Sequence, residues 1–209
     1  TVSSNLQTVG NASYSASGKV GGALSLDGNG DYLRVDGSDT LATGMPTGDG
    51  SYTLAAFIQT TTAGKGIIGW GSYGSGASVN ALRTDGAKLL NYSWGGGVDY
   101  SASAPTILDG QWHHVAATYD AASSTKRLYF DGAEIGSGKV IGDLTVGAQK
   151  FRIGSTNNGE YFNGLLDDMR VYNTALSESE ISGLSVPEPA TMSLLALGGL
   201  AILRRRRRS

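Results

Sequence analysis

The chain has 209 residues, of which 32 are glycine, 4 are proline and none is cysteine. This length suits one domain with an appendage, and the missing cysteines exclude disulfides, thiolate metal sites and cysteine nucleophiles. Five of the 16 basic residues are Arg204 to Arg208, so residues 1–203 carry 11 basic against 18 acidic side chains, a net charge of −7. Such an acidic body repels phosphates, which argues against nucleic acid as a partner.

Alternating side chains predict an all-β body. Residues 53–59 place Leu54 and Ile58 on one face and Phe57 on the other, which is typical of a central strand covered on both sides. Residues 112–120 alternate in the same way, and we expect Trp112 in the core. Further strands are predicted at 23–26, 32–35, 67–70, 89–93, 128–130, 133–135, 151–154 and 165–172, at spacings that suggest a β-sandwich.

Turn and helix-capping residues mark where the predicted elements begin and end. Asp131-Gly132 between two apolar runs predicts a two-residue hairpin, and Asp85-Gly86 predicts another. One short helix is expected at 177–183, because Ser177 and Glu180 have the spacing of a capping box. Leu176 and Ile181 form the matching hydrophobic staple.

The C-terminal segment has the composition of a membrane anchor. Residues 190–203 are an uncharged apolar run, followed by the five arginines. As a helix this run spans roughly 21 Å, short of the ~30 Å hydrocarbon layer, so it crosses only with arginine snorkelling or local thinning. The arginines are expected on the cytoplasmic side, which places everything before Val186 on the outer side.

Pro187, Glu188 and Pro189 come just before this run, and prolines keep such a segment extended and open to a protease. The whole segment resembles a PEP-CTERM sorting signal. That resemblance implies a precursor held by residues 190–203 in the inner membrane of an exopolysaccharide-producing bacterium, an exosortase-type processing enzyme as partner, and a final place at the cell surface or outside the cell. An uncleaved membrane anchor is the alternative. No amino-terminal signal peptide is visible, and we expect that it is removed or left out.

Three stretches carry a second resemblance. They are residues 22–28 with 31–33, residues 109–116 with 127–132, and residues 162–173 running into 175–177. In this order they are similar to a LamG-like (concanavalin A-like) domain, which implies a two-sheet antiparallel jelly-roll sandwich. We therefore assign residues 1–185 to the domain and 186–209 to the sorting and anchor segment. This fold hosts lectins, glycosidases, adhesive modules and spacers, so it does not fix the activity.

Catalytic patterns are weak. His113 and His114 are the two histidines, and neighbours on a strand point to opposite faces, so they do not share one site. A glycosidase needs two carboxylates facing one cleft, whereas Asp167 and Asp168 are adjacent and diverge. The glycine pattern at 69–74 lacks the following helix that a dinucleotide site requires. No catalytic residue is assigned, and we expect a protein that is not an enzyme.

Calcium is the predicted cofactor. The loop at 27–31 offers Asp27 and Asp31, and related jelly rolls often add an acid from the last strand, here Asp168 or its neighbour Asp167. The alternative is that Asp27 starts a turn and the last-strand acids accept backbone hydrogen bonds.

Ligand recognition is expected to use aromatic side chains, which stack on sugar rings beside polar groups. The candidates are Trp70, Tyr73, Tyr92, Trp94 and Tyr100, with Asn80, Arg83 and Asn91 nearby in sequence. The predicted function is a surface or secreted module that binds a glycan or matrix polymer. A structural or protein-adhesive domain and an unrecognised glycoside hydrolase are the alternatives.

Overall fold

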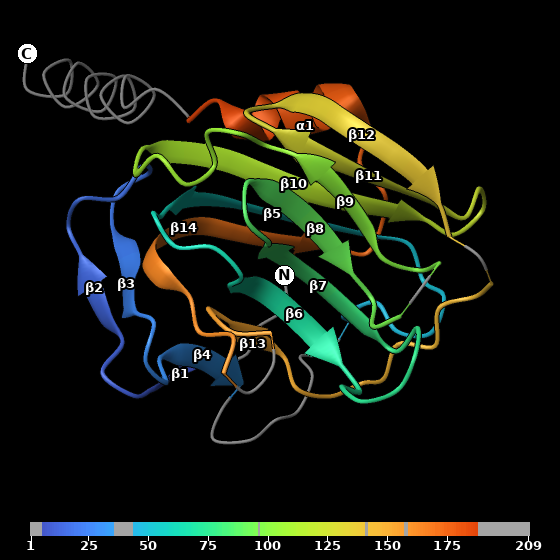
Figure 1. Ribbon diagram of the computed structural model, residues 1–209, viewed down its shortest axis with the longest axis horizontal. Coiled ribbons are helices and arrows are strands. Elements are labelled where there is room, and N and C mark those ends of the chain that lie inside the picture. The colour runs from blue at the N-terminus through green and yellow to red at the C-terminus, as the bar shows by residue number, and fades with distance from the viewer. Residues whose placement is uncertain (1–5, 36–43, 96, 141, 157–158, 188–209) are drawn as a thin grey trace, which may run out of the picture.

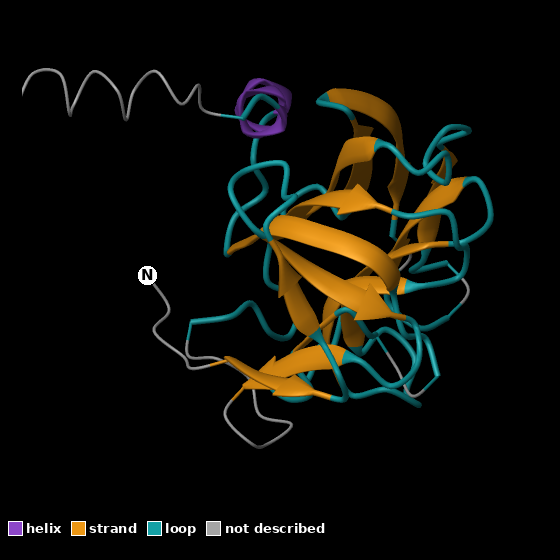
Figure 2. Ribbon diagram, turned by 90° about the vertical axis from the view of Figure 1, so that its left-hand side faces the viewer, coloured by secondary structure: helices purple, strands orange, loops and turns teal. Residues whose placement is uncertain are grey.

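The computed structural model describes residues 6–35, 44–95, 97–140, 142–156 and 159–187. These residues form two antiparallel sheets of seven strands each and one short helix. The two sheets lie face to face with the helix at one side (Figures 1 and 2). The predicted two-sheet jelly-roll sandwich is confirmed.

Sheet A and sheet B are named here by their strands. In spatial order, sheet A consists of β1 (Leu6–Val9), β4 (Tyr32–Val35), β13 (Arg152–Ile153), β6 (Gly66–Gly71), β7 (Val79–Thr84), β8 (Lys88–Tyr92) and β9 (Tyr100–Ser103). Sheet B consists of β12 (Ala133–Lys139), β11 (Thr125–Phe130), β10 (Trp112–Asp120), β5 (Tyr52–Gln59), β14 (Asn163–Tyr172), β3 (Ala23–Asp27) and β2 (Ser13–Ser15).

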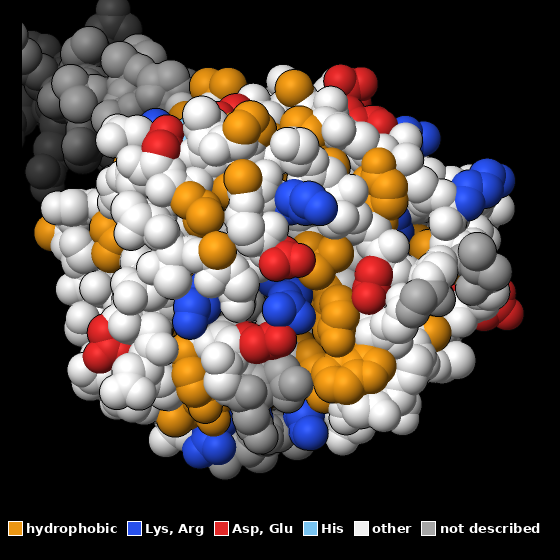
Figure 3. Space-filling model, in the orientation of Figure 1, with side chains coloured by type: hydrophobic (Ala, Val, Ile, Leu, Met, Phe, Trp, Pro, Cys, Tyr) orange, Lys and Arg blue, Asp and Glu red, His pale blue; other side chains and the backbone are white. Residues whose placement is uncertain are grey.

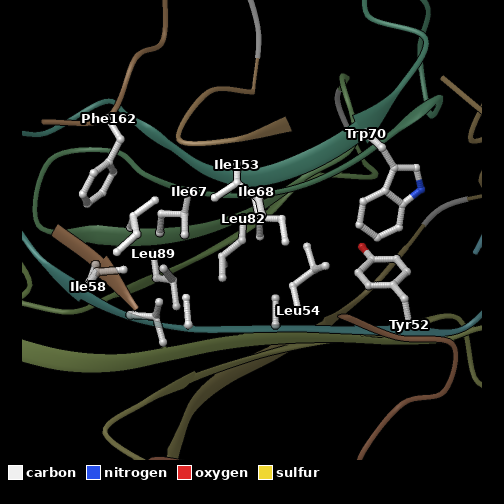
Figure 4. Packing of buried hydrophobic residues seen from close by; sticks show 14 of the residues in the cluster. Tyr52, Leu54, Ile58, Ile67, Ile68, Trp70, Leu82, Leu89, Ile153 and Phe162 are labelled. Atoms are coloured by element: carbon white, nitrogen blue, oxygen red, sulfur yellow. The ribbon is translucent and has the colours of Figure 1, made fainter. Parts of the chain in front are cut away.

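The core lies between the sheets because each central strand turns alternate apolar residues inward. From β5, Tyr52, Leu54 and Ile58 meet Ile68 and Leu82 of sheet A, all of them at most 1% exposed (Figure 4). Burying a side chain of this size stabilises the fold by about 1.5–3 kcal/mol. Strand β5 is buried along seven of its eight residues, as predicted for a strand covered on both sides.

The outer face of sheet B is covered in part by helix α1 (Glu178–Ser185). Ile181 is fully buried there against Ala55, Ala116 and Tyr129, and Leu176 packs beside it. Ser177 and Glu180 form the predicted capping box. The helix continues two residues beyond Gly183, where the sequence had predicted its end.

The Asp131-Gly132 hairpin is confirmed, because these two residues alone separate β11 from β12. Both have positive φ angles, 49° and 83°, as a type I′ turn requires. The Asp85-Gly86 hairpin also forms, with a third loop residue, Ala87, before β8 begins. Strands β1, β2, β7 and β9 were not predicted. Within the part of the chain that the structure describes, no helix has the length and apolar character to span a membrane.

Candidate ligand-binding site

The outer face of sheet A is built by strand alternation. In β8, Leu89 belongs to the core and the Asn91 amide reaches the Thr118 carbonyl oxygen of sheet B, 3.4 Å away. Tyr92 must therefore point outward. In β7, Leu82 points into the core and Arg83 points outward. Figure 3 shows apolar and charged side chains of both signs interleaved near the middle of the side where Figure 1 places β6, β7 and β8.

Three part-exposed aromatic residues meet on this face, and we call them the aromatic cluster: Tyr73, Tyr92 and Trp94. The ring of Trp94 lies 6.2 Å from that of Tyr73 and 5.9 Å from that of Tyr92, between centroids. The guanidinium of Arg83 lies 4.9 Å from the Tyr92 ring centroid, in a cation–π contact. The structure thus brings together three of the five predicted aromatic residues and the predicted Arg83, whereas Tyr100 packs against the core.

The backbone of Trp94 is held in an unusual conformation. Its φ angle is +67°, which is rare for a bulky residue. Both oxygens of Asp99 fix the flanking peptides, accepting from the Ser93 N–H at 2.6 Å and the Gly95 N–H at 3.2 Å. The Trp94 carbonyl accepts from the Ala77 N–H at 3.1 Å. Strained backbone that its surroundings hold in place is a feature of functional sites.

A row of register partners crosses the same face. From one strand to the next it runs through Arg34, Arg152, Gly69, Ala81 and Tyr92. At about 4.8 Å per strand, its ends are about 19 Å apart. The middle of the row has only small side chains, and a Cβ on Gly69 would lie 2.9 Å from the Tyr73 hydroxyl. Tyr73 therefore lies over Gly69.

Charged groups surround the aromatic cluster. Arg83 forms an ion pair of 2.9 Å with Glu160. Toward the Arg34 end of the row, the guanidinium of Arg152 lies 4.8 Å from the ring centroid of Tyr32. The Tyr32 ring in turn stacks on Tyr161. The sequence interpretation missed Arg34, Arg152, Glu160 and Asp99. The sequence did contain a signal for Arg34. In residues 32–35 the apolar Leu33 and Val35 alternate with Arg34, which indicates that Arg34 points to the outer face.

Several polar atoms at this site are buried without a partner. The Nε atoms of Arg34 and Arg83 and the hydroxyl of Tyr73 make no hydrogen bond to any of the described residues. Burial also raises the pKa of Tyr73, so the hydroxyl keeps its proton and stays a donor. Unpaired buried donors are uncommon and each calls for an explanation. A ligand that accepts hydrogen bonds would supply partners once these side chains move and expose the atoms.

A buried lysine lies beneath the Trp94 loop, between the sheets. The Nζ of Lys126 donates to the Ser93 hydroxyl at 2.6 Å and to the Asn91 carbonyl at 3.4 Å. Burial lowers the pKa of Lys126 to about 7, and the charge of Asp99 opposes that shift. Lys126 of sheet B therefore supports the Trp94 loop from the core side.

Three residues predicted at the site lie in the interior instead. Trp70 has no exposed surface, points into the core toward Tyr52, and donates from Nε1 to the Pro46 carbonyl at 2.8 Å (Figure 4). It is a core residue and does not face a ligand. Asn80 and Asn91 are buried as well, and the Asn91 amide oxygen accepts from the Tyr52 hydroxyl at 2.7 Å. Trp112, expected in the core, is instead half-buried at the start of β10.

The residues predicted for calcium separate into two places. Asp27 and Asp31 lie together, and all four of their carboxylate oxygens accept hydrogen bonds, two from Asn11, one from the Asn29 N–H and one from the Asp27 N–H. The Asn29 bond, followed by that of Asn11, lowers the pKa of Asp27. Asp168 is remote from these two residues. On β14 the residue opposite Asp27 is Asn163, and Asp168 comes five residues later, beyond the other end of β3.

The last-strand acids have partners of their own. Asp168 forms an ion pair of 2.8 Å with Arg170, and Asp167 accepts from the Val20 N–H at 2.6 Å. No cluster of three metal-ligating side chains occurs among the described residues. A cation at this rim would have two adjacent carboxylates, Asp27 and Asp31, and would have to displace their present hydrogen bonds. Calcium binding stays a prediction.

The two histidines point to opposite faces of β10, as predicted. His113 contacts Asp131 through Nδ1 at 2.8 Å and Asp109 through Nε2 at 3.1 Å. These two contacts outweigh burial and raise the pKa of His113. His114 packs against the Phe57 ring, and its burial lowers its pKa to about 4. Through its two ring nitrogens, His113 joins β10 to the hairpin turn at Asp131 and to the preceding loop at Asp109.

The outer face of sheet B offers a different kind of surface. Three hollows of about 330, 330 and 500 Å³ lie there, beside α1 or the segment leading to it. Their linings contain no aromatic side chain and are made mostly of small or charged residues. They lack the stacking surfaces that the aromatic cluster provides.

The predicted sorting motif lies at the edge of the described chain. Pro187 is half-buried after α1, and it lines the hollow that contains Asp168 and Arg170. Glu188, Pro189, the apolar run at 190–203 and the arginines lie outside the described residues. The sequence comparison covers this region, and the profile of the PEP-CTERM protein-sorting motif matches residues 185–208. That signal marks an exported protein that is anchored or processed at the membrane.

Solved structures and sequence relatives agree with the fold. The binding domain of Paraclostridial mosquitocidal protein 1 superposes with a TM-score of 0.69 at 15% identity, over 87% of this chain and 47% of that one. Domain 4 of the arabinanase AbnA from Geobacillus stearothermophilus, solved with arabinotriose, gives 0.63 at 22% identity over 87% of both chains. The adhesion G-protein coupled receptor V1 of Danio rerio is 28% identical over 81% of this chain.

This chain spans only 3% of the length of that receptor, so the likeness concerns one domain. The family profile described as the concanavalin A-like lectin/glucanases superfamily matches residues 27–182. That match covers most of the chain and both sheets. The protein therefore belongs to the concanavalin A-like lectin/glucanase superfamily, as a laminin-G-type domain followed by a PEP-CTERM sorting signal.

Proposed function

We propose that this protein is an exported surface module that binds carbohydrate on the outer face of sheet A. The observation that carries the proposal is the aromatic cluster, where three part-exposed rings lie beside buried donors that have no partner among the described residues. Aromatic rings stack on the apolar faces of sugars, and nearby donors bond to the sugar oxygens.

The Trp94 loop favours binding because it is ordered in advance. Asp99 and Ala77 fix the peptides on both sides of the ring. A ligand that stacks on Trp94 then loses little affinity to the ordering of protein groups. The AbnA domain with its bound arabinotriose is a precedent for sugar binding on this fold.

The sorting signal supports export of the protein, which brings the domain to the compartment where extracellular glycans occur. We propose that the precursor is held in the inner membrane through residues 190–203 with the domain on the outer side, and that an exosortase-type enzyme processes it near Pro187, Glu188 and Pro189. The released domain then meets a glycan or matrix polymer at the cell surface or outside the cell. On this proposal the protein is a binder and not an enzyme.

A glycan array on the purified chain tests the function. We expect binding to one class of glycan, and we expect Trp94→Ala to weaken it by about fivefold to a hundredfold, because stacking on a ring is worth about 1–3 kcal/mol. Trp94→Phe should keep most of the binding. Arrays run with calcium and with chelator test the calcium prediction, which depends on Asp27 and Asp31.

Tyr14→Ala is the matched control. Tyr14 is a 75% exposed aromatic residue at the edge of sheet B, and its removal should leave both binding and melting temperature unchanged. Equal losses from Tyr14→Ala and Trp94→Ala would contradict the proposed site. Capture of a protein partner that no sugar displaces would favour an adhesive domain, and release of sugar products would favour a hydrolase.

A further inference from the structure

Arginine is concentrated on the face that carries the aromatic cluster. Five arginines precede residue 204, and three of them, Arg34, Arg83 and Arg152, lie on the outer face of sheet A. The other two, Arg127 and Arg170, lie on sheet B and form ion pairs with Glu134 and Asp168. In a body with a net charge of −7, the three arginines outnumber the carboxylates of Glu160 and Asp99 that lie beside the aromatic cluster.

The arginine side chains are arranged across neighbouring strands. Arg34 and Arg152 are direct register partners, so two cations lie about 5 Å apart at the backbone. Arg152 is 7% exposed and lies under the site, whereas Arg34 is half-buried at its surface.

The unpartnered donors belong to the same arginines. The Nε atoms of Arg34 and Arg83 are buried and make no bond to the described part of the chain. An arginine offers its Nε and a terminal nitrogen as a fork that fits the two oxygens of a carboxylate. Neutral sugar hydroxyls do not require such a fork.

We infer that the outer face of sheet A recognises a polysaccharide that carries carboxylates, a uronic-acid polymer, with its sugar rings on the aromatic cluster and its acid groups at Arg34 and Arg83. This rests on the proposed function and names its ligand class. The row from Arg34 to Tyr92 is about 19 Å long, which accommodates several sugar rings in line.

Glu160 has a defined part in this arrangement. It is the carboxylate that now pairs with Arg83, at 2.9 Å, and its other oxygen accepts from the Thr156 hydroxyl at 2.7 Å. A ligand carboxylate at Arg83 competes with Glu160 and is repelled by its charge. Removing that charge must therefore strengthen binding, an effect that a merely structural residue would not produce.

The probe is polygalacturonate, compared with the same polymer fully methyl-esterified, with the full chain in low and high salt. We expect the acid form to bind at least about tenfold more tightly, since a hydrogen bond to a charged group is worth about 1.5–3 kcal/mol. Salt should weaken the acid form and leave the ester nearly unchanged.

Two variants with opposite effects test the residues. Arg34→Gln should remove most of the preference for the acid form, and Glu160→Gln should increase affinity for it several-fold. Each has a matched control on sheet B, where Arg127→Gln and Glu134→Gln break the exposed pair of 3.1 Å and should change nothing.

The outcomes separate this inference from the proposed function. Equal binding of acid and ester, with both lost in Trp94→Ala, would leave a carbohydrate module and overturn the carboxylate inference. Binding of polyglutamate as tight as that of polygalacturonate, or an Arg127→Gln effect equal to that of Arg34→Gln, would also overturn it. Failure to bind any glycan of the array would overturn the proposed function itself.

Discussion

The two outer faces of the sandwich are used in opposite ways. On sheet B, Ala55 and Ala116 are small, so α1 approaches closely and Ile181 becomes fully buried. On sheet A, Gly69 and Ala81 are equally small, but the Tyr73 ring lies over them and leaves its hydroxyl unpartnered among the described residues. The same device, small residues in the middle of a sheet, supports helix packing on one side and a candidate binding surface on the other.

The two faces differ in how much of their surface is covered by other parts of the domain. The covered face gains stability from apolar burial, and among the described residues the Nδ1 of His114 is the polar atom of this face that is buried without a partner. The open face keeps rings part-exposed and has donors without a partner among the described residues, which costs stability and which our proposal attributes to a ligand. Substitutions on the two faces should therefore separate into those that change unfolding and those that change binding.

The largest effect is expected from Ile181→Ala on the covered face. Truncating a fully buried isoleucine leaves a cavity between α1 and sheet B, so the free energy of unfolding should fall by about 2–5 kcal/mol. Urea unfolding measures it, and glycan affinity below the transition should not change. Val186→Ala, at a residue 65% exposed, is the control. A loss of binding in folded Ile181→Ala would mean that the two faces are not independent.

A pH-dependent effect is expected from Lys126, which lies beneath the open face. Its pKa of about 7 in the folded state is below the unfolded value of about 10.4. The unfolded chain therefore binds more protons between about pH 7 and 10, and stability rises with pH there, by at most about 1.4 kcal/mol per unit.

Lys126→Met should remove this rise, as measured by urea unfolding at pH 7.5 and pH 9.5. The exposed Lys88 provides the comparison, because Lys88→Met removes the same charge without changing a buried group. Identical pH slopes in the parent chain and Lys126→Met would refute the shifted pKa.

The smallest effect is expected at the cap of α1. Ser177→Ala removes the side chain that accepts from the Glu180 N–H, which should lower the free energy of unfolding by about 1 kcal/mol. Ser182→Ala on the exposed side of the helix should cost nothing. Thermal unfolding of the two variants compares them, and a cost at Ser182 equal to that at Ser177 would show that the cap contributes no specific stability.

Much of the fold was predictable because its central strands are read from local alternation. Strand β10 and its neighbour β5 are buried on both faces and read as near-continuous apolar runs. Strand β1 and strand β2 are short and exposed edge strands, with polar sequences that give no such signal. Strand β7 was missed because Asn80 and Arg83 interrupt its apolar pattern.

The site was predicted only in part, and the two tryptophans show why. Trp70 and Trp94 both precede glycine, yet one fills the core and the other lies on the surface. Trp70 comes two residues after Ile68 on the same strand and therefore points into the core with it, whereas Trp94 lies beyond the end of β8 with a positive φ. The pairing of Arg83 with Glu160 joins residues 77 positions apart, which no local pattern reveals.

The position of α1 determines how the domain is presented. The helix ends against the β11–β12 turn, where a Cβ on Gly132 would collide with Ser185, and the chain leaves it at Pro187 on the sheet B side. In the membrane-held precursor that we propose, a tether attached there holds the domain by its covered side. The arginine-bearing side then faces away from the attachment, so the order of the elements determines which side of the domain the anchor leaves open.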